Sequence, residues 1–205
     1  MLTHAHADHV NGLIEALRQY DVRRVLERDF DYDSPFYEAW RRAVEDEGAE
    51  VIQAQSEQVI AFGDGVSLEV VSPPSRLLRG TPSDVDNASV VLRLVYGEIS
   101  FLLTGDMFRD AETALVTRDA PIDSDVLKVG HHGSRTSTSS AFLDAVSPAI
   151  AVVSAGKDNR FGHPHTETIE NLRQHMPEDM IFLTMDTGTI EFVTDGKQLE
   201  VKTKR

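Results

Sequence analysis

Apolar positions in the first quarter of the chain recur at helical spacing in two places. They predict one helix over roughly 11–20 and a second helix over 35–47. Short runs rich in β-branched residues follow and indicate strands, and a Gly-Asp-Gly turn joins the last two of them as a hairpin. The strands expected from these runs cover 50–54, 58–62 and 66–72.

The second half of the chain alternates between strand-like and helix-like segments. Two β-branched runs, 88–96 and 99–105, are separated only by Gly97 and Glu98 and therefore indicate another hairpin. Strand groups interleaved with helices predict a layered α/β protein with mixed sheets. The other expected segments are strands at 125–130 and 149–155, helices at 139–146 and 166–175, and three closing strands at 180–185, 189–194 and 199–203.

The composition is that of a globular protein that contains no cysteine. A chain of 205 residues, 40% of them hydrophobic, can form one domain, 1–205, with a sizeable core. The lack of cysteine excludes disulfides, thiolate metal ligands and a cysteine nucleophile. No apolar run reaches the ~18–20 residues that a membrane span needs, and residues 1–10 do not resemble a signal peptide. We therefore expect a cytoplasmic location and no membrane segment in this chain.

The charge is acidic overall but positive in one segment. A formal net charge of −14 argues against a protein that grips nucleic acid over a broad basic surface. Residues 128–165 instead carry a net charge of +2 and four histidines, so the remainder of the chain carries −16. An acidic body with one positive, histidine-rich segment fits a small anionic substrate or a single exposed phosphodiester. The basic residues of this segment are Lys128, Arg135, Lys157 and Arg160.

Candidate metal ligands begin at the N-terminus, where His4, His6, Asp8 and His9 fall within six residues. Imidazole and carboxylate are the ligands that zinc and similar cations take when no thiolate is available. Side chains two positions apart in an extended segment point the same way, so His4 and His6 can bind one ion. If the chain then turns into a helix, Asp8 and His9 face a second ion. Two such clusters predict a site that holds both the attacking water and the leaving oxygen.

Two later elements fit the same site. The apolar run 102–106 ends in Gly-Asp, which places Asp106 at the end of a strand, where ligands gather in layered α/β proteins, and where it could bridge two ions. The run 125–134 is a buried-looking strand that leads into a loop of Gly, Ser and Thr. That loop carries His131 and His132, and a pair of histidines flanked by glycines favours a functional role over a place in the core.

Together and in this order, these motifs resemble those of the metallo-β-lactamase-fold hydrolases. The HxHxDH run at 4–9, the LLTGD run at 102–106 and the HHGS run at 131–134 correspond to the family's metal motifs. The strongest likeness is to the hydrolase domain of the competence DNA-uptake family ComEC, whose NxS and NRxGHPH stretches correspond to 87–89 and 159–165. The resemblance covers nearly the whole chain. It implies an αββα sandwich with mixed sheets and a metal-dependent hydrolase.

The resemblance also implies a set of metal ligands. Two divalent ions, zinc or manganese, would share the site, the first held by His4 and His6 and the second by Asp8 and His9. Asp106 would bridge the ions, and His131 would complete the second site.

The remaining roles concern the water and the substrate. A metal-activated water would attack, and Asp8 is placed to orient it or to accept its proton. The residues expected to face the substrate, as proton donors or as groups that hold a phosphate oxygen, are Lys128, His132, His163 and His165.

Two departures from the family pattern bear on the site. Where the general pattern has a further histidine before the Gly-Asp strand, this chain has Asn87 and Ser89. A neutral amide oxygen is a poorer zinc ligand than imidazole, so we expect a weakly held first metal, with manganese or a single ion as alternatives. Family members also carry several strands before HxHxDH, whereas Met1 is three residues from the first ligand. The expectation is a chain that lacks the usual first strands, either because it is a fragment or because an N-terminal piece or a partner supplies them.

Three classes of function fit the sequence. The favoured class is a phosphodiesterase, nuclease-like, acting on a phosphate-containing substrate such as single-stranded DNA or a small phosphodiester. A second class is an acyl hydrolase of the thioesterase or lactonase type, because the fold alone does not decide the substrate. A third is a truncated, non-catalytic module that binds a partner.

Overall fold

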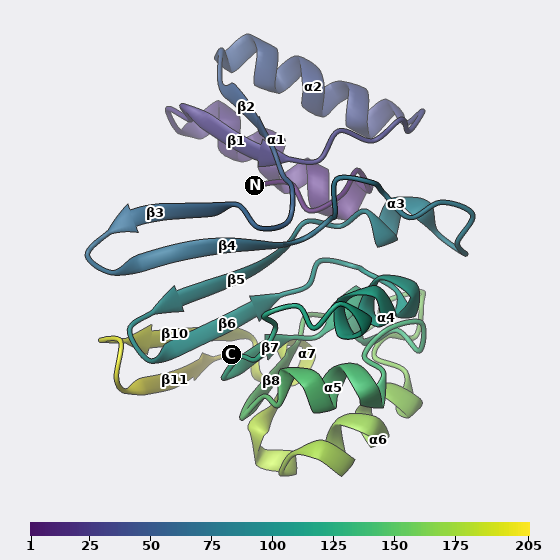
Figure 1. Ribbon diagram of the computed structural model, residues 1–205, viewed down its shortest axis with the longest axis vertical. Coiled ribbons are helices and arrows are strands. Elements are labelled where there is room, and N and C mark those ends of the chain that lie inside the picture. Colours follow the sequence, from purple (N-terminus) through teal and green to yellow (C-terminus); the bar gives the residue numbers. More distant parts are fainter.

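A seven-stranded mixed sheet forms the centre of the protein, as the computed structural model of residues 1–205 shows (Figure 1). Neighbouring strands are antiparallel from β3 to β6 and parallel from β6 to β9. The α/β class with mixed sheets that the sequence predicts is thereby confirmed. The strands, in their order across the sheet, are β3 (Val59–Gly63), β4 (Val66–Ser72), β5 (Val91–Tyr96), β6 (Ile99–Leu103), β7 (Val126–Lys128), β8 (Ile150–Val153) and β9 (Ile181–Leu183).

Three helices pack against the parallel part of this sheet, below it in Figure 1. Each helix lies in a crossover between two parallel strands, which is the connection that parallel pairing requires. The largest apolar core lies between these helices and the sheet, where Leu127 of β7 and Phe142 and Leu172 of the helices are no more than 1% exposed. The helices are α4 (Arg109–Thr117), α5 (Ser140–Val146) and α6 (Thr166–His175).

The N-terminal quarter adds a small parallel sheet covered by two helices, above the large sheet in Figure 1. Its own core joins the two helices, with Tyr37 and Trp40 buried against Val10 and Leu17. The Trp40 indole N–H donates a hydrogen bond to the Glu27 carboxylate, which ties the second helix to the first strand. The elements are α1 (Ala7–Gln19), β1 (Arg24–Glu27), α2 (Pro35–Glu47) and β2 (Glu50–Gln53).

The residues just before the first helix run between the two sheets. The Leu2 N–H donates to the Leu26 carbonyl at 3.0 Å, and the Val90 N–H donates to the Thr3 carbonyl at 2.8 Å. The segment that leads to His4 therefore has backbone partners on both sides. Strand β1 and the chain entering β5 supply these hydrogen bonds.

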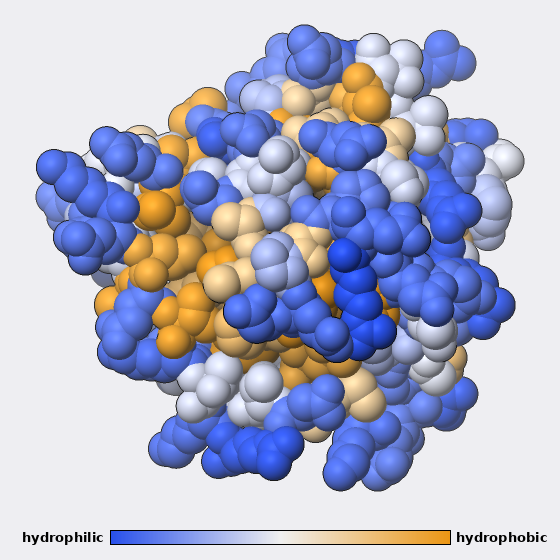
Figure 2. All heavy atoms as spheres, turned by 90° about the horizontal axis from the view of Figure 1, so that it is seen from below, coloured by the Kyte–Doolittle hydropathy of each residue, from blue (hydrophilic) through white to orange (hydrophobic).

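A C-terminal hairpin and several short turns complete the fold. The hairpin packs against the large sheet through Phe192, whose ring lies 5.5 Å from that of Phe101. Seen from below, the surface shows apolar side chains framed by hydrophilic ones (Figure 2). These elements are α3 (Asp84–Asn87), α7 (Thr184–Thr187), β10 (Thr189–Thr194), β11 (Leu199–Lys204) and 3-10 turns at Gly130–Gly133 and Glu178–Met180.

The sequence-based prediction of elements differs from the structure in several places, and it lacks β1 and α3 altogether. The first helix begins at Ala7 and not near residue 11, because His6 already adopts the extended conformation that precedes a helix. The helix Arg109–Thr117 is absent from the prediction, and the strand expected at 180–185 divides into a short strand and a short helix. None of the helices is long and apolar enough to span a bilayer, while the cytoplasmic location stays a prediction.

Leu127 tests how far stability depends on the core under the parallel strands. Leu127→Ala should lower the free energy of unfolding by about 2–5 kcal/mol, because the site is fully buried and the packing around it relaxes only in part. Val193→Ala, at a position 44% exposed, should change it by less than about 0.5 kcal/mol. Urea unfolding of both variants measures the difference, and equal effects would contradict this assignment of the core.

Candidate metal centre

Four of the predicted ligands come from the loop before α1 and from its first turn. The Thr3 hydroxyl oxygen lies 3.1 Å from His4 Nδ1 and 3.0 Å from His9 Nδ1. These contacts fix both rings and leave each Nε2 free to face the site, as hydrogen-bonded partners of metal-binding histidines do. Asp8 and His9 lie on the helix itself rather than in a preceding turn.

A first cluster consists of His4, His6 and Asp86. Asp86 Oδ1 lies 3.3 Å from His4 Nε2 and 3.2 Å from His6 Nδ1, and the two ring nitrogens are 3.0 Å apart. Donor atoms around one tetrahedral ion at about 2.0–2.1 Å lie about 3.3 Å from one another. The three side chains therefore have the separation of ligands to a single ion.

A second cluster consists of Asp8, His9, Asp106 and His132. Asp106 Oδ2 lies 3.3 Å from the Nε2 atoms of both His9 and His132. His132 Nε2 also lies 3.3 Å from Asp8 Oδ2, and His9 Nε2 lies 3.7 Å from the same oxygen. Asp106 Oδ2 is 3.9 Å from His4 Nε2 of the first cluster, so this carboxylate stands between the two groups.

Asp106 reaches this place because β6 ends in a tight turn. Its backbone N–H donates to Ser89 Oγ at 3.2 Å, and Gly105 adopts a φ of +56°. A side chain at position 105 would come within 3.0 Å of Ser89 and 3.2 Å of Thr3, so glycine is required there. Leu103 pairs with Lys128 across β6 and β7, which brings the ends of these strands, and hence Asp106 and His132, to one edge.

The donor set fits two divalent cations. Six buried side-chain polar atoms have no hydrogen-bond partner in the protein, and four of the six belong to the two clusters. Such atoms are costly inside a protein unless something else satisfies them. The four in the clusters are His9 Nε2, Asp86 Oδ1, Asp106 Oδ1 and His132 Nε2, and the other two are Arg28 Nε and Thr168 Oγ1.

The structure places His132, and not His131, with the second cluster. Both residues adopt left-handed backbone conformations, with φ of +45° and +55°. The turn directs His132 toward Asp8 and Asp106, with its Nδ1 bonded to the Ser154 carbonyl at 2.8 Å. His131 turns away, hydrogen-bonds Thr136 at 3.0 Å and stacks on Phe108. The ring that lies with the second cluster is thus that of His132 and not that of His131, the residue expected from the sequence, and two successive left-handed residues set this arrangement.

Asp86 is the ligand candidate that sequence reasoning missed. Asn87 and Ser89, considered in its place, serve the backbone: Asn87 Oδ1 accepts from the N–H groups of Phe108 and Ala111 at the start of α4, and Ser89 holds the turn at Asp106. The available signal was an aspartate directly before the Asn-Ala-Ser run. The Asp86 carboxylate joins His4 and His6 as a third donor, where the general family pattern has a histidine.

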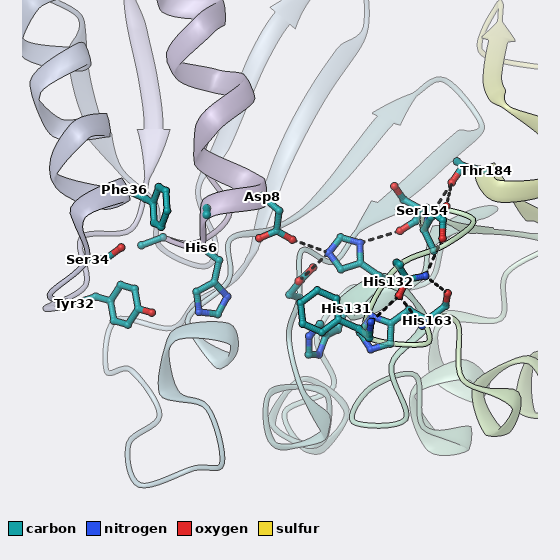
Figure 3. A pocket seen from close by; sticks show the side chains of 17 residues that line it. His6, Asp8, Tyr32, Ser34, Phe36, His131, His132, Ser154, His163 and Thr184 are labelled. Carbon is teal, nitrogen blue, oxygen red and sulfur yellow. Dashed lines mark hydrogen bonds and ion pairs between the residues drawn. The ribbon is translucent and has the colours of Figure 1, made fainter.

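The other predicted substrate-facing residues divide into two groups. His163 lines the cleft, together with Asp8, His131 and His132 (Figure 3). His165 instead accepts a hydrogen bond from the Arg135 backbone N–H at 3.1 Å and holds a loop. Lys128 lies behind Asp106, where its Nζ donates to the carbonyls of Gly105 and Val129 at 3.2 Å. Neither His165 nor Lys128 lines the cleft, whose volume is about 790 Å³.

The carboxylates and imidazoles of the clusters perturb one another. The nearby carboxylates of Asp106 and then Asp8 raise the pKa of His132 to about 10, while the contact with His132 lowers the pKa of Asp8 to about 2. Burial alone would raise the pKa of Asp106, but the contacts with the His132 and His9 imidazoles outweigh it, lower the pKa and hold the carboxyl ionised. Burial lowers the pKa of His4 to about 3 and that of His163 to about 4, so both rings are neutral at pH 7.

The comparisons with known proteins define the class to which this site belongs. The family model described as "Metallo-beta-lactamase superfamily" matches residues 1–157. The chain therefore belongs to the metallo-β-lactamase superfamily, as its motifs predict. Among solved structures, CmlA, a diiron β-hydroxylase from Streptomyces venezuelae, superimposes with a TM-score of 0.58 at 16% identity over 84% of this chain and 40% of that chain. That likeness shows the fold alone.

Within the superfamily, the similar curated proteins are of the ComEC competence type. The chain is 32% identical over 192 residues to ComE operon protein 3 of Bacillus subtilis, which covers 94% of this chain and 24% of that protein. It is 43% identical over 114 residues to competence protein ComA of Neisseria gonorrhoeae, 55% of this chain and 16% of that protein. It is 36% identical over 141 residues to recombination protein 2 of Haemophilus influenzae, 69% of this chain and 17% of that protein. The chain thus spans about a quarter or less of each relative.

The pairing of His132 with two carboxylates predicts a pH-dependent stability of the metal-free protein. Because the pKa of His132 rises from 6.5 to about 10 on folding, its contribution is complete below about pH 6.5 and is lost as the pH rises toward 10. In the presence of a chelator, the Tm of the wild type should therefore fall over this range relative to His132→Gln. Tm curves of the two proteins that stay parallel from pH 6 to 10 would contradict the pairing.

Proposed function

We propose that this chain hydrolyses phosphodiesters with the help of two divalent ions, zinc or manganese. The observation that carries the proposal is the pair of adjacent clusters that flank Asp106 and open onto one cleft. A pair of ions about 3.5–4 Å apart suits the displacement of one oxygen by another at phosphorus. His4, His6 and Asp86 would hold one ion, and Asp8, His9, Asp106 and His132 the other.

The ions, when bound, would lower the pKa of a water and polarise a phosphoryl oxygen. The chain's own residues would then orient the reactants. The Asp8 side chain is 62% exposed, so it can reach a water in the cleft and take its proton, as the sequence predicts. His163 is neutral at pH 7 because burial lowers its pKa, so it serves as a hydrogen-bond donor to a phosphate oxygen.

Two residues of the predicted catalytic set would support the site without contacting the substrate. Lys128 would hold Asp106 in place, since its ammonium lies 4.0 Å from Asp106 Oδ1 and donates to the carbonyl of Gly105. His165 would hold the loop that carries Arg135. Both are positioning residues, because neither lines the cleft.

The charge distribution supports a phosphate substrate over a neutral acyl one. The +2 charge of 128–165 lies on the elements that form the His132 side of the cleft, while the rest of the chain is strongly negative. A local positive potential of this kind attracts an anionic ester. The curated relatives are named for competence and recombination, which agrees with DNA as a phosphodiester substrate.

A substrate panel tests the proposal. Zinc- or manganese-loaded protein should hydrolyse bis(p-nitrophenyl) phosphate, with much lower kcat/KM for an acyl thioester and a lactone. Asp8→Asn should lower kcat/KM for the phosphodiester by about 100- to 10,000-fold, because it removes the proton acceptor.

Asp21→Asn is the matched control, since the Asp21 side chain is 82% exposed and far from the ligands in sequence. It should leave the rate unchanged. Faster turnover of the thioester or lactone would favour the acyl hydrolase, and no turnover of any substrate by metal-loaded protein would favour a binding module.

A further inference from the structure

Three aromatic side chains line the cleft beside the metal ligands. Phe161 is 62% exposed and Phe36 is 45% exposed, while Tyr32 is half-buried. Rings of this size are normally buried, because each removes a large apolar area from water when it packs. Arg160 and His163 contact the Phe161 ring, but both phenylalanines keep a large exposed area that is available to a planar ligand.

The rings stand on both sides of the cleft. Tyr32 and Phe36 lie on the side of His6 and Asp8, away from the His132 side (Figure 3). The Tyr32 ring meets the His6 ring edge-on at 5.8 Å, which places it directly beside the first cluster. This wall is part of the segment that enters α2 and is fixed by the buried Tyr37 and Trp40 below it.

On the other side, Phe161 continues a row of nearly parallel rings that leads to the second cluster. Phe161 and His163 lie 5.8 Å apart at 22°, and His163 and His132 lie 6.3 Å apart at 19°. Asn159 holds this turn, because its Oδ1 accepts from the N–H groups of Phe161 and His163. The Phe161 ring is therefore presented at a fixed tilt and at a short distance from a metal ligand.

Two basic side chains lie on the same loop as the exposed Phe161 ring. The Arg160 guanidinium lies 4.8 Å from the centre of the Phe161 ring, and Lys157 is exposed on the same loop. Exposed aromatic rings combined with nearby basic side chains are the features by which proteins bind single-stranded nucleic acid, with bases stacked on rings and phosphates near cations. A paired base in a duplex has both faces occupied by its neighbours and could not insert between the two walls.

We propose that Phe36 and Phe161 stack on an unpaired nucleobase next to the phosphodiester at the metal centre. The inference rests on the proposed function and deepens it, by making the substrate a single-stranded nucleic acid recognised through its bases. Hydrolysis of a simple phosphodiester would not depend on these two rings. Binding of a single strand, in contrast, would depend on both rings.

The test is equilibrium binding, which is independent of turnover. Zinc-loaded protein is titrated against a fluorescein-labelled oligothymidylate with hydrolysis-resistant phosphorothioate linkages, and against a strand of the same length and linkage that has no bases. Phe36→Ala and Phe161→Ala should each raise the Kd for oligothymidylate by about 5- to 150-fold, the value expected for the loss of one stacked base. The abasic strand should bind more weakly to the wild type and equally to all variants.

Phe62→Ala is the matched control, because Phe62 is 63% exposed and lies on β3, outside the cleft. It should leave both Kd values unchanged, and Phe161→Leu, which keeps an apolar side chain without a ring face, should behave like Phe161→Ala. Equal binding of the two strands by the wild type, no detectable binding of either, or equal effects of Phe62→Ala and Phe161→Ala would overturn the inference. A chain that binds as described but hydrolyses no phosphodiester would refute the proposed function and leave the stacking site standing.

Discussion

The cost of placing carboxylates inside the protein dominates the structure around Asp106. Asp86 and Asp106 are 4% and 2% exposed, and both are surrounded by imidazoles at 3.2–3.3 Å. A buried negative charge is tolerated only when cations or hydrogen-bond donors compensate it. The carboxylates come from the short α3 and the end of β6, and the compensating imidazoles come from the loop before α1, the first turn of α1 and the turn after β7. The mutual orientation of these segments therefore depends on the charges that they enclose.

The motif residues that could be predicted from the sequence are those whose positions follow from local spacing. The HxHxDH run places four candidate ligands within one loop and one helical turn, so their proximity needs no knowledge of the fold. Asp106 follows from the same logic, since an apolar strand that ends in Gly-Asp puts a carboxylate at a sheet edge. Helix α2 and strand β4 were predicted with the residues that the structure shows, because each has a clear apolar period.

The parts that could not be predicted depend on backbone conformation and distant contacts. The choice between His131 and His132 rests on two successive left-handed residues, which apolar periodicity does not reveal. Asp86 lies on a helix of four residues that has no period to detect. Helix α4 begins where Asn87, more than twenty residues earlier, accepts two of its N–H groups. Neither a left-handed backbone conformation nor a partner remote in sequence follows from a local apolar pattern.

The central claim is that two ions are held by His4, His6 and Asp86 and by Asp8, His9, Asp106 and His132. Elemental analysis of the purified chain after equilibration with zinc or manganese, compared between His132→Ala and His131→Ala, tests it most directly. The account predicts close to two ions per chain in the wild type and in His131→Ala, and close to one in His132→Ala. Retention of both ions by His132→Ala, or loss of one by His131→Ala alone, would contradict it.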